Sequence, residues 1–213
     1  MAHQDLGNKA QLSIKMNESL KNRFKKVFTT NLWGSRESRS GKGSELRQTE
    51  LIIKQIPEII KKYKICSILD APCGDYNYMK EIKLQCKYIG IDIVSELIES
   101  NSLKYNSVDF RCLDITSDDL PRCDLVLVRD LFSHLSNDHI KCSIQNIKKS
   151  GAKFLLVTSY TDHKKNLDLG SGPDKQWRRI NLEKEPFNLN VEAKYSDGGC
   201  PINKDKSLLL INI

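Results

Sequence analysis

Short apolar segments alternate with helix-forming segments between residues 65 and 160, and this alternation limits the fold more than any other feature. The apolar segments are runs rich in Ile, Leu and Val: "ICSILDA", "KYIGIDI", "SVDFRCLDI", "CDLVLVRD" and "AKFLLVTSY". Strands of this composition are buried on both faces, as in parallel sheets covered by helices. The segments between them are "YNYMKEIKL", "VSELIESNSLKY" and "NDHIKCSIQNIKKSG". The pattern predicts an α/β fold with a doubly wound, mostly parallel sheet.

Two further segments near the C-terminus complete the predicted sheet. They are "NVEAKYSD" and "KDKSLLLINI", and no helix-forming segment follows the second. Strands without a crossover helix between them can pair in antiparallel fashion. We therefore expect a seven-stranded core over residues 65–213, with an antiparallel C-terminal strand. The stretch 160–188 is too long for a plain connection and is expected to be an insertion that helps to build a substrate pocket.

Residues 1–64 are predicted to form a helical cap and a covering loop. Apolar and basic residues at helical spacing predict a helix over 12–31. "WGSRESRSGKGSE" follows as a loop that is ordered or closes over a ligand. Ser44 is expected to cap the next helix, in which Pro57 marks a kink. The apolar face of that helix comprises Leu46, Ile52, Ile53, Ile56, Ile59 and Ile60.

Composition restricts the class of partner. The chain has 213 residues and a formal net charge of +7, but its lysines are spread through helical stretches such as "IIKKYK". Basic runs interleaved with aromatic residues are absent, so the charge fits solvated helix faces better than a nucleic-acid site. No apolar run approaches the roughly 18 residues of a membrane span, and the N-terminus lacks the apolar core of a signal peptide.

Cysteine usage predicts a cytoplasmic protein. The seven cysteines are an odd number without close pairing, and most lie in apolar segments. We expect reduced, small core residues rather than a disulfide framework. No CxxC pair or Cys/His cluster has the spacing of zinc ligands.

The segment "LDAPCGD" ends the first predicted strand with a carboxylate and adds one glycine. Ligands of open α/β sheets bind beyond the carboxyl ends of the strands, near the turn after the first strand. Gly74 lets the backbone approach a ligand, and the next segment is expected to be a helix that offers N–H groups. A dinucleotide site would show GxGxxG. Because Asp70 would repel a pyrophosphate and attract an amino group, the predicted ligand has a cationic part.

Two more acids end the next two predicted strands. Asp92 ends "YIGIDI", where a carboxylate can accept hydrogen bonds from both hydroxyls of a ribose. Asp114 ends "RCLDI", where a carboxylate can accept from the exocyclic amine of an adenine. An amino-acid cation, a ribose and an adenine together make S-adenosylmethionine.

With these motifs the chain resembles the class I S-adenosylmethionine-dependent methyltransferases, over about residues 65–160. The resemblance is closer to a branch associated with glycan modification, some of it in large DNA viruses, through "LDAPCGDYNYM", "WGSRESRSGKGSE" and "WRRINL". Ala71 and Pro72 depart from the usual glycine-rich turn. The resemblance implies a Rossmann-like sheet, S-adenosyl-L-methionine as cofactor and S-adenosyl-L-homocysteine as product. The implied cofactor-binding residues are Asp70, Ala71, Pro72, Gly74, Asp92, Ile93, Asp114, Ile115 and Arg129.

The segment "VRDLFSHLS" after the fourth strand carries the candidate catalytic residues. Asp130 and His134 are four residues apart and would share one face of a helical turn. A carboxylate beside an imidazole orients it and raises its basicity, as expected of a general base for a hydroxyl. A capping or packing role for His134 is the alternative. No "NPPY" or "DPPY" signature of amine methylation and no catalytic cysteine is evident.

Candidate acceptor-binding residues come from the loops. Trp177 offers a flat face for a sugar ring and Arg178 can hold a hydroxyl or phosphate, while Trp33 and Glu37 lie across the expected mouth. The favoured activity is therefore methyl transfer to a hydroxyl of a sugar or glycan. Another small molecule, RNA or protein as acceptor, and a non-catalytic cofactor-binding module, remain alternatives. A divalent metal bound through Asp130 is compatible with the sequence but not required by it.

Overall fold

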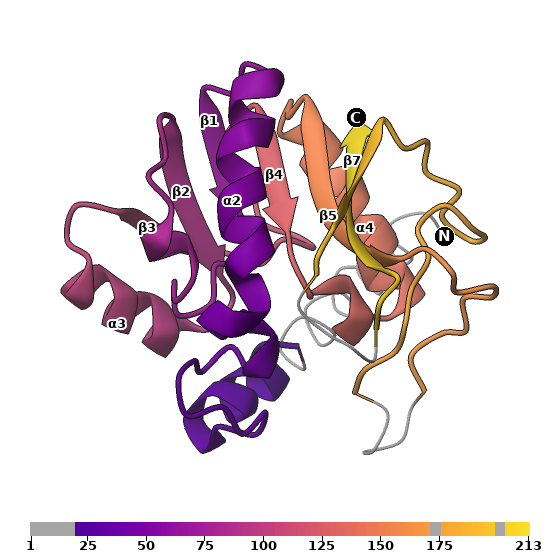
Figure 1. The fold of residues 1–213 in the computed structure, drawn as a ribbon. Helices are drawn as coiled ribbons and strands as arrows, with labels where there is room; N and C mark the ends of the chain where they lie inside the picture. The colour runs from indigo at the N-terminus through magenta and orange to yellow at the C-terminus, as the bar shows by residue number, and fades with distance from the viewer. Residues whose placement is uncertain (1–19, 171–175, 199–202) are drawn as a thin grey trace, which may run out of the picture.

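A seven-stranded sheet forms the centre of the computed structural model, which describes residues 20–170, 176–198 and 203–213. Its strand order is β3-β2-β1-β4-β5-β7-β6 (Figure 1). β1 to β5 are parallel to one another, whereas β7 is antiparallel to both β5 and β6. This confirms the predicted fold class. The strands are β1 (Ser67–Asp70), β2 (Lys87–Asp92), β3 (Asp109–Cys112), β4 (Leu125–Val128), β5 (Phe154–Tyr160), β6 (Ala193–Ser196) and β7 (Lys206–Asn212).

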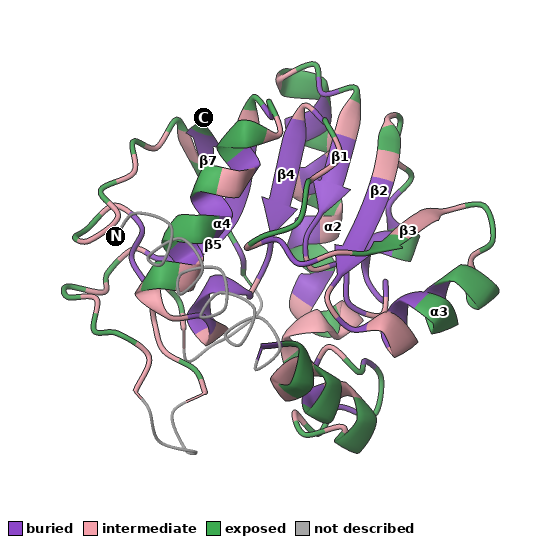
Figure 2. Cartoon of the chain, turned by 180° about the vertical axis from the view of Figure 1, so that it is seen from behind, coloured by how far each residue is buried: buried purple, intermediate pink, exposed green. Residues whose placement is uncertain are grey.

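Helices cover both faces of the sheet. α2 (Leu46–Lys62) lies on one face and α4 (Asn137–Lys149) on the other, with α3 (Ser95–Lys104) near β3 (Figures 1 and 2). The central strand β4 explains the continuous apolar pattern: Leu125 and Leu127 pack into the core beneath α2, and the two valines between and after them pack into the opposite core. Burial on both faces therefore leaves no polar alternation in this strand.

α2 is amphipathic as predicted. Ile52, Ile56, Ile59 and Ile60 are buried against the sheet, and the helix is continuous through Pro57. The start of the helix differs from the prediction, because Ser44 is not its cap. Glu45 occupies the cap position, but its side chain makes no capping hydrogen bond to the helix.

The connection from β1 to β2 was predicted to be helical over residues 76–84, and that prediction is wrong. It contains only the 3-10 turn η2 (Met79–Glu81). Tyr76 has φ of 60°, a left-handed conformation that cannot continue an α-helix. Tyr76, Tyr78 and Met79 are all buried. This connection is held by packing on several sides, which an amphipathic surface helix does not have.

The N-terminal segment lies at the carboxyl ends of the strands. Residues 20–30 are helical, whereas residues 12–19 of the predicted helix lie outside the described part of the chain. In Figure 1 this indigo helix lies below the arrowheads of β1, β2 and β4. A 3-10 turn, η1 (Lys42–Ser44), then leads into α2.

The insertion after β5 runs as coil over its described residues 161–170 and 176–188. Asn181 is buried, and its amide Nδ2 donates to the carbonyls of Thr161 and His163 at 3.0 Å each. The Tyr160 amide donates to the Ile180 carbonyl at 2.8 Å. The segment "WRRINL" is therefore fixed to the end of β5.

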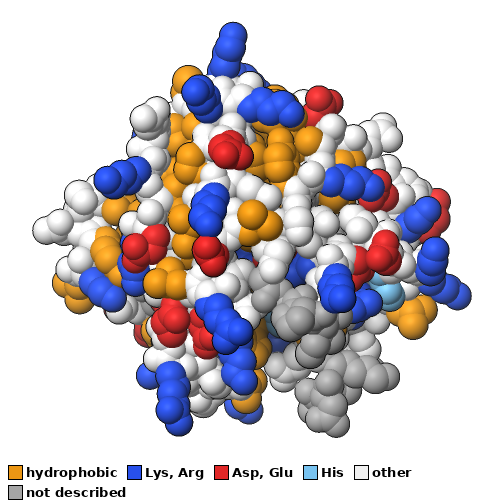
Figure 3. Space-filling view, in the orientation of Figure 1, with side chains coloured by type: hydrophobic (Ala, Val, Ile, Leu, Met, Phe, Trp, Pro, Cys, Tyr) orange, Lys and Arg blue, Asp and Glu red, His pale blue; other side chains and the backbone are white. Residues whose placement is uncertain are grey.

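The distribution of charged side chains on the surface agrees with the prediction made from the sequence. Lys and Arg side chains are scattered among Asp and Glu over the face seen in Figure 3, and do not gather into one basic patch.

The cysteine prediction is correct in part, because Cys73 and Cys123 are buried but Cys66, Cys112 and Cys142 are exposed. Within the described residues, no helix is long and apolar enough to cross a membrane.

Candidate active site

A cavity of about 610 Å³ lies at the carboxyl ends of the strands. Residues that end or follow β1, β2 and β3 form one side of it, over 71–74, 91–94 and 113–116. The N-terminal helix and the loop 39–44 line it from another side. Other lining residues come from the segments after β4 and β6, from the end of β5, from the start of β7 and from the insertion, and include Arg129, Asp130, His134, Tyr160, Trp177, Asp197 and Lys206. The volume falls in the range of small-molecule sites.

Asp92 and Asp114 both line the cavity, as predicted. Burial raises the pKa of Asp92 to about 6, although the Val94 amide, which donates to its Oδ1 at 3.0 Å, opposes this shift. Asp114 Oδ1 accepts from the amide and the hydroxyl of Thr116 at 2.8 and 2.7 Å. Its other oxygen, Oδ2, is buried and has no hydrogen-bond partner among the residues that the structure describes. A buried carboxylate oxygen of this kind calls for a donor from a ligand.

Asp70 ends β1 as predicted but does not line the cavity. Its Oδ2 accepts from the Tyr88 hydroxyl at 2.7 Å, and the side chain is buried beneath the turn. Burial raises the pKa of Asp70 to about 7. The expectation that Asp70 itself meets an amino group is not met, whereas Ala71, Pro72 and Gly74 lie on the cavity wall.

The glycine turn is bonded to the loop that precedes α2. Asp75 accepts from the Ser38 hydroxyl at 2.8 Å and from the Arg39 amide at 2.7 Å, and its own amide donates to the Ser40 hydroxyl at 3.0 Å. Gly74 has φ of 52°, and a Cβ on it would lie 2.0 Å from Ser40 Oγ. The motifs "LDAPCGD" and "SRSGKGS" therefore pack on one another. The helix expected to offer N–H groups after Gly74 is absent.

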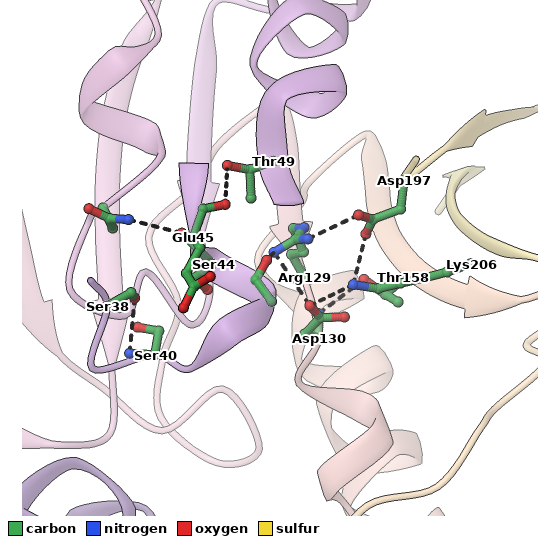
Figure 4. Close-up of polar contacts among 12 residues, drawn as sticks. Ser38, Ser40, Ser44, Glu45, Thr49, Arg129, Asp130, Thr158, Asp197 and Lys206 are labelled. Carbon is green, nitrogen blue, oxygen red and sulfur yellow. Dashed lines mark hydrogen bonds and ion pairs between the residues drawn. The ribbon is translucent and has the colours of Figure 1, made fainter. Parts of the chain in front are cut away.

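Four charged side chains, three of them buried, meet where β4 and β6 end and β7 begins (Figure 4). Arg129 Nη2 lies 3.0 Å from Asp197 Oδ1, and its Nη1 donates to the Gly43 carbonyl at 2.9 Å. Lys206 Nζ lies 2.8 Å from Asp130 Oδ2 and 3.1 Å from Asp197 Oδ2. Burial raises the pKa of Asp130, but Lys206 and Arg129 outweigh it and bring the value to about 2. Asp130 is therefore a carboxylate over the whole physiological pH range.

His134 and Asp130 do not form the predicted dyad. Asp130 has φ of 59° and precedes the 3-10 turn η3 (Phe132–His134), so the two side chains do not share a helical face. His134 Nδ1 instead lies 2.7 Å from the Gln176 carbonyl oxygen. A carbonyl only accepts, so Nδ1 carries the proton and Nε2 has the lone pair. Burial lowers the pKa of His134, which favours this neutral form.

The two predicted tryptophans line the cavity and the other two acceptor candidates do not. Trp33 stacks on His134 with ring centroids 4.9 Å apart, and Trp177 meets Tyr160 edge-on at 5.7 Å. Glu37 instead caps α2 through the Leu46 amide at 2.8 Å.

Arg178 is likewise structural. Its guanidinium donates to the Leu135 carbonyl at 2.6 Å and the Asn137 side chain at 3.0 Å, and also to the Leu167 carbonyl. The prediction that it holds an acceptor is not supported, because these bonds join the insertion to the start of α4.

Several lining residues were not foreseen from the sequence. Lys206 enters the site through the antiparallel register of β5 and β7, in which Tyr160 faces Lys206, and Asp197 enters it through the pairing of β6 with β7. The one available indication was a charged residue at the start of an otherwise apolar strand, in "KDKSLLL".

No group of three or more metal-ligating side chains is found within the described ranges. One oxygen of Asp130, Oδ2, faces two cations, Lys206 and Arg129.

Solved structures with the same fold are S-adenosylmethionine-dependent methyltransferases of distant sequence. The 1,6-didemethyltoxoflavin-N1-methyltransferase of Burkholderia thailandensis superposes with a TM-score of 0.63 at 12% identity, over 93% of this chain and 88% of that one. Magnesium protoporphyrin IX methyltransferase of Synechocystis PCC 6803 gives 0.57 at 9% identity, over 78% and 80%. The N-methyltransferase NodS of Bradyrhizobium japonicum WM9 gives 0.55 at 16% identity, over 78% and 93%.

These similarities show the class I methyltransferase fold. No protein-family model and no curated protein sequence matches the chain. The resemblance to a glycan-modifying branch therefore rests on the sequence motifs alone.

Proposed function

We propose that this chain is an S-adenosylmethionine-dependent O-methyltransferase whose acceptor is a hydroxyl of a sugar or glycan. The observation that carries the cofactor assignment is the pair Asp92 and Asp114 on one cavity wall, with Asp114 Oδ2 buried and unpartnered. Asp92 would hold the ribose hydroxyls and Asp114 the adenine amine. Ala71, Pro72 and Gly74 would line the amino-acid end, with Ile93 and Ile115 packing against the adenosine. The structural neighbours with bound cofactor or product support this choice.

His134 is the proposed general base. When bound, S-adenosylmethionine supplies an electrophilic methyl group on a sulfonium. Nε2 of His134 would take the proton of the acceptor hydroxyl while its oxygen bonds to the methyl carbon in place of the sulfur. The Gln176 carbonyl fixes the tautomer that leaves Nε2 ready to accept it. Trp33, stacked on the imidazole, restricts its rotation.

Calorimetry with S-adenosylhomocysteine tests the cofactor assignment. Asp92→Ala and Asp114→Asn should each weaken binding by about 1.5–3 kcal/mol, the scale of hydrogen bonds to charged groups. Asp109→Asn is the matched control, because Asp109 pairs with Arg111 on β3 and does not line the cavity. Failure of the parent protein to bind would overturn the proposal.

Mass spectrometry tests the acceptor class. Cell glycans made with and without the protein should differ by one methyl group. Methyl transfer to an amine or to RNA, with unchanged glycans, would contradict the hydroxyl acceptor while leaving the cofactor assignment intact.

A further inference from the structure

The charged cluster at the ends of β4, β6 and β7 retains unused hydrogen-bonding capacity toward the cavity. Asp130 Oδ2 accepts a hydrogen bond from Lys206 at 2.8 Å and forms an ion pair with Arg129 at 3.4 Å. No described residue bonds to its Oδ1, and the side chain is 31% exposed. Asp130 therefore presents a free acceptor on the cavity wall.

Lys206 presents a donor beside it. An ammonium group has three N–H donors. Two of them reach Asp130 at 2.8 Å and Asp197 at 3.1 Å, and the described part of the chain supplies no third acceptor. Lys206 is only 8% exposed, yet it lines the cavity. A buried donor in this position is suited to a ligand atom, because leaving it unpaired is costly.

The balance of charge indicates a neutral ligand group. Arg129 and Lys206 are matched by Asp130 and Asp197, so the formal charges of the cluster cancel. A phosphate would meet two carboxylates here, and an ammonium would meet two cations. A hydroxyl group can donate to a carboxylate and accept from an ammonium, and it carries no charge to be repelled.

An aromatic surface adjoins the cluster. Tyr160 at the end of β5 faces Lys206 on β7 in the sheet register. Trp177 packs edge-on against Tyr160 at 5.7 Å, with its own side chain 45% exposed and lining the cavity. The apolar face of a sugar ring packs on such a surface while its hydroxyls reach polar groups at the edge.

Resting on the proposed function, we infer that Asp130 and Lys206 form the acceptor-binding pair, which takes two adjacent hydroxyls of one sugar ring packed on Trp177. One hydroxyl donates to Asp130 Oδ1, and its neighbour accepts from Lys206 Nζ. The strained backbone of Asp130, a non-glycine residue at φ of 59°, is maintained by the Thr158 hydroxyl, which accepts from its amide at 3.0 Å. Such strain is found where a side chain must be aimed. Asp130 thus binds the acceptor and His134 takes its proton.

Ligand-observed saturation-transfer NMR on the protein saturated with S-adenosylhomocysteine tests this pair. The probes are the methyl glycosides of mannose, galactose and glucose, together with monodeoxy forms that each lack one of two adjacent hydroxyls. At least one intact glycoside should bind, and its matching deoxy form should bind at least fivefold more weakly. Asp130→Asn and Lys206→Met should each weaken the intact glycoside at least fivefold and remove the difference between the two probes.

Lys194→Met is the control, since Lys194 lies on β6 with a half-exposed side chain paired to Glu183. It should bind all probes as the parent does, and S-adenosylhomocysteine affinity should stay within twofold in every variant. The assignment is overturned if no glycoside binds the loaded protein, if intact and deoxy forms bind equally, or if only phosphorylated sugars bind. Binding of S-adenosylhomocysteine to the parent is measured first, and a failure to bind counts against the proposed function itself.

Discussion

Arg129 and Asp197 form an ion pair between the end of β4 and the segment after β6, with 3.0 Å between Nη2 and Oδ1 and both side chains almost wholly buried. The pair joins the parallel half of the sheet to its antiparallel edge. Arg129 also donates to the Gly43 carbonyl in the loop that lines the cavity. One guanidinium therefore connects three parts of the site.

Arg129→Met should destabilise the protein by about 3–5 kcal/mol, the cost of leaving one partner of a buried pair uncompensated. Lys206 still faces Asp197 at 3.1 Å, so the loss should lie at the lower end of that range. Urea denaturation measures it. Lys153→Met, which removes an exposed partner of Asp124, should cost much less, because solvent screens an exposed ion pair. Equal losses in the two variants would show that Arg129 is not a structural anchor.

The stability of the protein should depend on pH through Asp70. Its pKa is raised by burial to about 7 from 3.8, so the folded state holds a proton that the unfolded state has released between these values. The contribution is present in full below pH 3.8 and is lost as the pH rises to about 7. In Asp70→Asn this loss cannot occur, so the variant should gain about 1–3 kcal/mol relative to the parent between pH 5 and pH 8.

Urea titrations of both proteins at several pH values provide the measurement. The difference between the two proteins cancels the titrating groups that do not interact with Asp70. A difference that does not change with pH would show that Asp70 is ionised in the folded protein at pH 5. Tyr88→Phe is a useful companion, because it removes the one hydroxyl that donates to Asp70 and should raise the pKa further.

The sequence predicted the sheet well and the side-chain directions less well. Asp70, Asp92 and Asp114 were correctly placed at or just beyond three strand ends, yet Asp70 is directed under the turn. The direction of the Asp70 side chain depends on which face of the pleated strand it occupies. On that face it meets Tyr88, a residue of the neighbouring strand. The supposed Asp130–His134 dyad failed for a local reason, since four-residue spacing implies one face only in an α-helix. The place of Lys206 in the site could not be predicted from the sequence, because strand register is a property of the whole sheet.

Gly74 should tolerate no side chain, for two separable reasons. Alanine at φ of 52° costs about 1–2 kcal/mol of backbone strain, and its Cβ would collide with Ser40 Oγ at 2.0 Å. Gly74→Ala should therefore lose more than that amount in thermal or urea unfolding. Adding Ser40→Gly should recover the steric part and leave the backbone part.

Ser40→Gly alone supplies the reference, because it removes the hydroxyl that accepts from the Asp75 amide. Strictly additive losses in the double variant would contradict the close packing of the two motifs.

The tautomer of His134 can be observed directly, without knowledge of the acceptor. Because Nδ1 donates to the Gln176 carbonyl and burial lowers the pKa, the ring at pH 7 should be neutral with a bare Nε2. Nitrogen-15 NMR of the imidazole should show one protonated and one unprotonated nitrogen, and protonation only on acidification below the usual histidine range. His139 serves as the internal comparison, since its Nδ1 meets a hydroxyl, which can donate or accept.

Once an acceptor is identified, His134→Ala should lower kcat about 10²- to 10⁴-fold and leave S-adenosylhomocysteine affinity unchanged. A charged imidazole at pH 7, or full turnover by the alanine variant, would remove His134 from the role of base.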